Sequence, residues 1–200
     1  GDALIDCDIL TVATNATVTS IQISSGSITI INPSVPFTVN GVLTITGELE
    51  MADGSVVDAG GDVTVAAAGT LDMDGTSRLK MEGDLSFSGI LEASDDSRID
   101  LDGDTEQTIF GTPSTNPTIN RLFCSSSATV FNLTATINDT LDAGGEDFTI
   151  SSGKTLTMNA GSVTILSGGN WTRDGTLTLH ADSKLLYTTN NQTALPNITF

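Results

Sequence analysis

Pairs of apolar residues separated by one residue recur along this chain about every 21 residues. Three such series interleave, each with spacings of 20 to 22 residues. They are Leu43/Ile45, Val63/Val65 and Leu85/Phe87; Leu49/Met51, Leu71/Met73 and Leu91/Ala93; and Val57, Leu79/Met81 and Ile99/Leu101. Their upstream continuations are Ile21/Ile23, Ile28/Ile30 and Phe37/Val39. Between the pairs lie Gly, Asp, Asn and Ser, which favour turns.

This pattern predicts an all-β chain, a three-sided parallel β-helix (β-solenoid). Each face stacks one strand per coil, about 4.8 Å above the last, so like apolar residues form inward ladders. A single coil cannot bury its own apolar side, so coils need neighbours. About nine coils of about 21 residues fit the 200 residues. The variable coil length argues against a strict left-handed hexapeptide helix and favours a right-handed one.

A longer repeat of about 85 residues, or four coils, lies above the coil. Its matched islands include Val57–Gly61 with Leu141–Gly145, Thr70–Met73 with Thr155–Met158, Gly83–Leu85 with Gly169–Trp171, Asp96–Leu101 with Asp182–Tyr187, and Gln107–Thr108 with Gln192–Thr193. We therefore expect residues 1–200 to form one continuous solenoid, with super-repeats at about 40–124 and 125–200. An irregular loop is expected near 111–127, which contains Pro113 and Pro117.

The formal net charge of −18 excludes several partners. Nucleic acid needs Lys and Arg for its phosphates, and an anionic membrane repels such a chain, so we expect neither nucleic-acid binding nor membrane insertion. No signal peptide, transmembrane run or lipidation motif is found. The chain starts at Gly1 without Met and is interpreted as a piece of a longer protein.

A coil ending in Gln107-Thr108-Ile109, then a loop, then the strand Val130–Leu133, resembles the repetitive β-solenoid surface proteins of Bacteroidota. The opening segments Ala16–Ile21 and Phe37–Gly41 resemble theirs too. The resemblance implies a long extracellular protein, exported by the type IX system and used in adhesion or as a cell-surface stalk.

Catalysis by this fold needs clustered acids with a base or a metal on adjacent coils. The single His180 has no obvious partner, and Arg98 and Lys184 occupy equivalent repeat positions, which indicates a structural or solvating role. Trp171 is the main sugar-stacking candidate, but its match to Leu85 indicates that it faces inward. We therefore predict no enzyme, no catalytic residue and no cofactor.

Two acidic segments are candidate calcium sites. Asp100, Asp102 and Asp104 alternate, as do Asp72 and Asp74, and hard oxygen ligands suit calcium. Neither segment fits an EF-hand loop or the nonapeptide calcium repeat. We interpret both as polar outer faces and predict no metal site.

Other residues carry weaker signals. Cys7 and Cys124 lie more than five coils apart, too far for a disulfide without a loop that folds back. Asn-x-Thr acceptors for glycosylation occur at Asn15, Asn132, Asn138, Asn170, Asn191 and Asn197. Thr155/Thr157 and Thr176/Thr178 make a two-coil Thr-x-Thr array of the kind that ice-binding solenoids use.

The sequence thus predicts a non-catalytic structural or adhesive segment of a large extracellular surface protein or fibre. The alternative is a carbohydrate-binding or carbohydrate-cleaving β-helix, for which an exposed groove of aromatic and acidic residues spanning coils would speak. Expected partners are neighbouring repeats of the same chain, further copies in a bundle or filament, and a glycan or surface of another cell.

Overall fold

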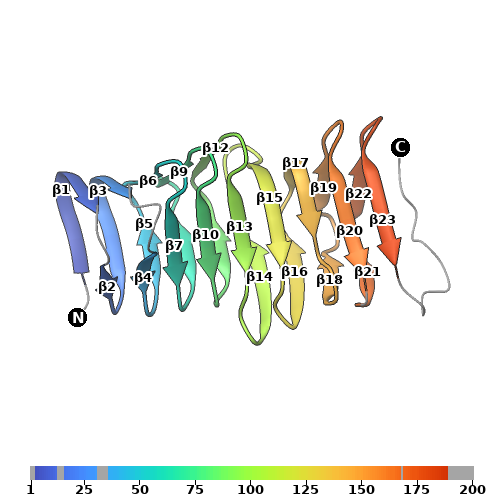
Figure 1. Cartoon of the computed structure of the whole chain (residues 1–200), viewed down its shortest axis with the longest axis horizontal. Coiled ribbons are helices and arrows are strands. Elements are labelled where there is room, and N and C mark those ends of the chain that lie inside the picture. The colour runs from blue at the N-terminus through green and yellow to red at the C-terminus, as the bar shows by residue number, and fades with distance from the viewer. Residues whose placement is uncertain (1–2, 13–15, 31–35, 168, 189–200) are drawn as a thin grey trace.

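The alternation of apolar and polar residues decides which way the side chains of each strand point. The computed structural model describes residues 3–12, 16–30, 36–167 and 169–188, and these form parallel strands with no helix among them. The strands stack as a β-solenoid of about 8 turns with a spacing of about 21 residues (Figure 1). The predicted fold class is confirmed, while the right-handed sense stays a prediction.

Each turn of the chain visits three faces in the same order. The first face comprises the start of β3 (Ile21–Ile30), then β5 (Leu43–Ile45), β8 (Val63–Val65), β11 (Leu85–Phe87), β14 (Glu106–Phe110), β16 (Ala128–Asn132), β18 (Asp147–Ile150) and β21 (Trp171–Arg173). The second comprises the end of β3, then β6 (Glu48–Met51), β9 (Thr70–Met73), β12 (Ile90–Ala93), the starts of β15 (Thr118–Cys124) and β17 (Ala135–Asp142), β19 (Thr155–Met158) and β22 (Thr176–Leu179). The third comprises β2 (Thr17–Val18), β4 (Phe37–Val39), β7 (Val56–Ala59), β10 (Arg78–Met81), β13 (Arg98–Leu101), the ends of β15 and β17, β20 (Val163–Ser167) and β23 (Lys184–Thr188). β1 (Ala3–Val12) pairs with β3.

The register confirms the three predicted series. Leu43 pairs with Val63, and Val63 with Leu85. The second and third series pair in the same way. Most of these inward residues are buried in one hydrophobic core that continues along the stack. Burial of each Leu, Ile, Val or Met side chain contributes about 1.5 to 3 kcal/mol, so the ladders hold the turns together.

The corner between the second and third faces is built by tight four-residue turns that share one hydrogen bond. A serine closes each turn by donating its N–H to the carbonyl three residues earlier; these serines are Ser55, Ser77, Ser97, Ser162 and Ser183. Gly54 and Gly161 supply the positive φ that the turn requires, at 74° and 77°. Asp95 and Asp182 adopt positive φ without being glycine.

Strands β15 and β17 run straight through this corner, and asparagine side chains replace the turn. Asn120 donates an amide N–H to the Ser97 hydroxyl, Asn138 donates to Asn120, and Asn159 donates to Asn138. Amides stacked at the strand spacing satisfy one another's donors and acceptors. The ladder keeps the turns in register where the tight turn is missing.

The predicted irregular loop near 111–127 is interrupted by a strand. Residues 111–117 and 125–127 are irregular, but Thr118–Cys124 between them forms β15. The second-face pairing is broken between β12 and β15, although the faces on either side of it pair continuously. Pro117, which precedes β15, has no N–H to give to a ladder, which fits a break at this point. Leu91 and Ala93 of β12 are accordingly only half-buried.

Most segments matched by the four-turn super-repeat of the sequence also occupy equivalent positions in the structure, four turns apart. Val57 reaches Leu141 through four successive pairings on the third face. Trp171 is an exception: it pairs with Phe148 and lies two residues away from the column of Leu85. The expectation that Trp171 faces inward is nevertheless confirmed, since it is buried. The Gln192–Thr193 island lies outside the described residues.

Candidate ligand-binding groove on the third face

Three arginines stack in register on the third face. Arg78 of β10 pairs with Arg98 of β13, and Arg98 pairs with Arg121 of β15. Each precedes an inward Leu or Ile, so the alternation points all three outward, at intervals of about 4.8 Å. With Lys80, this row holds four of the seven lysines and arginines of the chain. Basic side chains are therefore concentrated on three adjacent strands of an acidic molecule.

Asp100 lies between two of these arginines. Its side chain is 3% exposed and pairs with Nε of Arg78. Nη2 of Arg98 donates to Asp100 Oδ2 over 2.9 Å, and Arg98 Nε lies 2.6 Å from Oδ1. The contact between Arg98 Nε and Asp100 Oδ1 is an ion pair only, since neither atom has a hydrogen-bond partner. A buried carboxylate is costly unless charges of opposite sign surround it, so Asp100 depends on this pair of arginines.

Phe123 covers the other side of Arg98. Arg98 Cζ lies 4.3 Å from the centroid of the Phe123 ring, within the range of a cation–π contact. Arg121 is held at the surface by Asp96, whose Oδ1 lies 2.6 Å from Nη2, and by Asp139. The arginines are thus fixed by partners on neighbouring turns, which orders the row.

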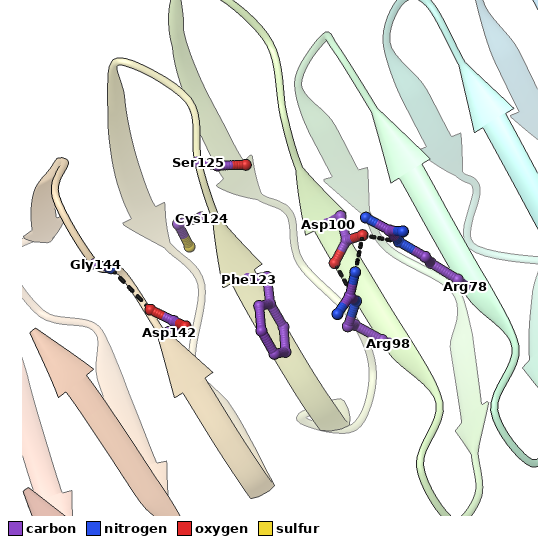
Figure 2. A pocket seen from close by; sticks show the side chains of 8 residues that line it. All are labelled: Arg78, Arg98, Asp100, Phe123, Cys124, Ser125, Asp142 and Gly144. Carbon is purple, nitrogen blue, oxygen red and sulfur yellow. Dashed lines mark hydrogen bonds and ion pairs between the residues drawn. The ribbon is translucent and has the colours of Figure 1, made fainter.

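Two adjoining hollows lie along this row. The first, the arginine hollow, has a volume of about 280 Å³ and is lined by Thr76, Arg78, Asp96, Arg98 and Arg121. The second, the phenylalanine hollow, has a volume of about 160 Å³ and is lined by Arg78, Arg98, Asp100, Phe123, Cys124, Ser125, Asp142 and Gly144 (Figure 2). Both share Arg78 and Arg98, so together they form one groove. In Figure 2, Phe123 stands between the Asp100–arginine cluster and Asp142.

The candidate calcium ligands Asp100 and Asp102 are each engaged by basic side chains. Asp100 is enclosed by Arg78 and Arg98, and Asp102 Oδ2 forms an ion pair with Lys80 Nζ at 2.8 Å. This hydrogen bond to Asp102 is the largest of the effects that raise the pKa of Lys80. Among the described residues, no group of three or more His, Cys, Asp or Glu is arranged to hold a metal ion.

The second face carries an acidic row instead. Glu50 pairs with Asp72, and Asp72 pairs with Glu92. Burial, followed by repulsion from Asp74 and from these neighbours, raises the pKa of Asp72 above its ordinary value. The row is a repulsive stack of carboxylates, in contrast to the balanced charges of the third face.

Other residues considered from the sequence lie outside the groove. His180 is exposed at the start of a corner turn, and Arg98 and Lys184 do occupy one column of the third face. Asn138, one of the glycosylation motifs, is engaged on both sides in the asparagine ladder. Cys124 is buried and free, while the side chain of Cys7 lies outside the described residues.

The Thr-x-Thr array is longer than the sequence indicated. Thr155 pairs with Thr176 and Thr157 with Thr178, and Thr136 stacks on Thr157 one turn earlier. Thr134 belongs to the same earlier turn, where its hydroxyl accepts the Thr155 N–H. The array therefore covers three turns of the second face.

Sequence reasoning missed the groove, although a signal was present. Each arginine sits between a corner Ser or Asn and an inward aliphatic residue: Ser77-Arg78-Leu79, Ser97-Arg98-Ile99 and Asn120-Arg121-Leu122. The third member, Arg121, is hard to recognise because it lies in the segment that the sequence predicts to be a loop.

Comparison with protein-family models, curated proteins and solved structures finds no match to this chain. Among the described residues no helix is long and apolar enough to cross a membrane. The groove and the fold are therefore the features from which a function is proposed.

Proposed function

We propose that this chain is a rigid, non-catalytic spacer segment of a large extracellular surface protein or fibre. The observation that carries the proposal is the continuous hydrophobic core along about 8 stacked turns. At about 4.8 Å per turn, the described stack is a rod of roughly 40 Å. Bending such a rod would expose ladders of buried side chains to water, so the rod resists bending and holds its two ends at a fixed distance.

The repeat supports the same proposal. A four-turn unit that returns along the chain lets a rod lengthen by addition of units, each contacting only its neighbours. Open ends of a sheet template aggregation unless they are covered. Neighbouring repeats of the parent chain are the partners that would cover them.

A surface location, export by the type IX system and a role in adhesion belong to this proposal through the resemblance to Bacteroidota surface proteins. The net charge of −18 keeps such rods apart at low salt. Side-by-side bundling of copies would need that repulsion to be screened.

Electron microscopy of the full-length parent protein tests the proposal. Thin rods, with a length that grows with the number of repeats of about 85 residues, are the expected result. Isolated globular particles with a single ligand cleft would overturn it. Small-angle X-ray scattering of this 200-residue chain gives a second measurement, and we expect the scattering profile of a rod.

Carbohydrate binding is a second candidate function, and one observation favours it. The phenylalanine hollow combines an aromatic ring with Asp and Arg side chains from adjacent turns. Aromatic faces with a few fixed polar groups are the usual composition of a ligand site. For carbohydrate cleavage the groove is less suited, because its most buried acid, Asp100, is held by two arginines.

A further inference from the structure

We infer that the third-face groove binds an acidic saccharide, with its anionic group in the arginine hollow and a sugar ring against Phe123. This inference rests on the second candidate function, carbohydrate binding, and assigns its ligand class. It is independent of the spacer proposal, since a rod can carry a binding groove on one face.

The unused guanidinium donors of the arginine hollow identify the anionic end. Its lining brings three guanidinium groups together with the carboxylate of Asp96, and the same arginines also pair with Asp100 and Asp139. The charges of this cluster are balanced, and its distinguishing feature is the gathering of three of the chain's seven Lys and Arg residues in one place. Guanidinium groups in a fixed fork bind carboxylate and sulfate through paired, charge-assisted hydrogen bonds.

Donors remain for such a ligand. Among the described residues, Arg78 uses only Nε in its contact with Asp100, which leaves its terminal N–H groups available. Arg98 and Arg121 use Nε and Nη2, and each keeps Nη1. All three side chains are about one-third exposed, so a ligand reaches them from solvent.

The phenylalanine hollow has the composition for an uncharged ring. Arg78 and Arg98 are balanced there by Asp100 and Asp142, so the hollow is close to neutral. Asp142 Oδ1 accepts the Gly144 N–H at 3.0 Å, and the same carboxylate has further lone pairs for a sugar hydroxyl. The ring of Phe123 offers apolar area to the C–H groups of a sugar.

The size of the groove favours an extended ligand. Each hollow is smaller than the roughly 300 Å³ at the lower end of small-molecule pockets. Because the two hollows share Arg78 and Arg98, a chain of rings crossing both has its acidic and neutral units side by side. A single enclosed small molecule fits less well.

The test compares two disaccharides that differ only in one carboxylate: cellobiouronic acid and cellobiose. Binding is followed by chemical-shift changes in the arginine Nε–H and Phe123 ring signals of the 20.6 kDa chain. We expect saturable binding of cellobiouronate, at least about tenfold tighter than that of cellobiose, weakening as salt is added. Sodium sulfate is titrated separately, and we expect it to bind more weakly than the acidic disaccharide.

Three variants each remove one positive charge. Arg78→Gln and Arg121→Gln remove donors from the arginine hollow, and each should weaken cellobiouronate binding about tenfold. Lys80→Gln is the matched control, because Lys80 bonds Asp58 and Asp102 outside both hollows. It should change binding less than twofold. Unchanged amide spectra away from the site establish that each variant is folded.

The outcomes separate the two proposals. Equal binding of both disaccharides, or equal loss in all three variants, would overturn the acidic-saccharide inference and leave carbohydrate binding standing. Sulfate binding as tight as that of cellobiouronate would overturn the saccharide part of the inference. No binding of either sugar would overturn both the inference and the second candidate function.

Discussion

The guanidinium carbon of Arg98 lies 4.3 Å from the ring centroid of Phe123, on the neighbouring turn of the solenoid. Because Arg98 also contacts Asp100, this contact links the buried Asp100 carboxylate to Phe123, which lines the phenylalanine hollow. A cation over an aromatic face contributes about 0.5 to 1 kcal/mol at exposed sites. Arg98 is thereby held on two sides, by a carboxylate and by a ring.

A double-mutant cycle should detect this contact. Phe123→Leu keeps an apolar side chain without the ring, and Arg98→Lys keeps the charge without the planar group. We expect a coupling of about 0.5 kcal/mol between the two changes, from urea unfolding of the single and double variants. Additive effects would mean that the ring and the guanidinium group contribute independently.

Replacement of the buried acid should have a larger effect. Asp100→Asn removes the charge that both Arg78 and Arg98 contact, and we expect a loss of about 2 to 3 kcal/mol in the free energy of unfolding. Asp102→Asn is the control, since its ion pair with Lys80 is partly exposed and should be worth less than about 1 kcal/mol. Similar losses in both variants, measured by urea unfolding, would contradict the role given to Asp100.

The ladders show why the fold was predictable from the sequence. A solenoid repeats one packing problem, so Leu43, Val63 and Leu85 meet the same buried environment and leave a periodic trace in the sequence. Turn residues repeat for the same reason. The architecture follows from local rules applied again on every turn.

The groove was less predictable, because it depends on which outward residues meet across turns. Arg121 aligns with Arg98 only if the excursion before it is the right length and Thr118–Cys124 forms a strand. An insertion shifts register by an amount that spacing alone does not fix. Similarly, the sequence placed Trp171 at the column of Leu85, while the register differs by two residues.

Stability should depend on pH through the acidic row. Burial and the nearby carboxylates, of which Asp74 and Glu92 are the strongest, raise the pKa of Asp72. The folded protein then binds this proton more tightly than the unfolded chain does. Stability therefore falls as pH rises from about 4 through the raised pKa, and the full cost is present at neutral pH.

Asp72→Asn should relieve that cost. We expect a gain of about 0.5 kcal/mol at pH 7, because like charges opposite each other on neighbouring strands are destabilising by this order. The gain should diminish as the pH falls through the raised pKa of Asp72, and it should disappear below the ordinary carboxyl pKa of about 4, where the folded and unfolded forms are both protonated. Asp104→Asn, at an exposed acid outside the row, provides the control for net charge. Equal gains from the two variants, in thermal unfolding at pH 7, would assign the effect to net charge alone.

Cys124 should be unreactive in the folded chain. Burial raises the pKa of its thiol to about 12, against a smaller opposite effect of its hydrogen bond with Thr129. At pH 8 only about one thiol in ten thousand is then ionised, compared with about a quarter in an unfolded chain with a pKa near 8.5. Because the thiolate is the reactive form, alkylation by iodoacetamide should be about a thousandfold slower in the native protein than in concentrated guanidinium chloride. Mass spectrometry of the peptide that contains Cys124 measures this rate separately from that of Cys7. Comparable rates in the two conditions would mean that β15 opens readily, which would also weaken the case for the groove built on it.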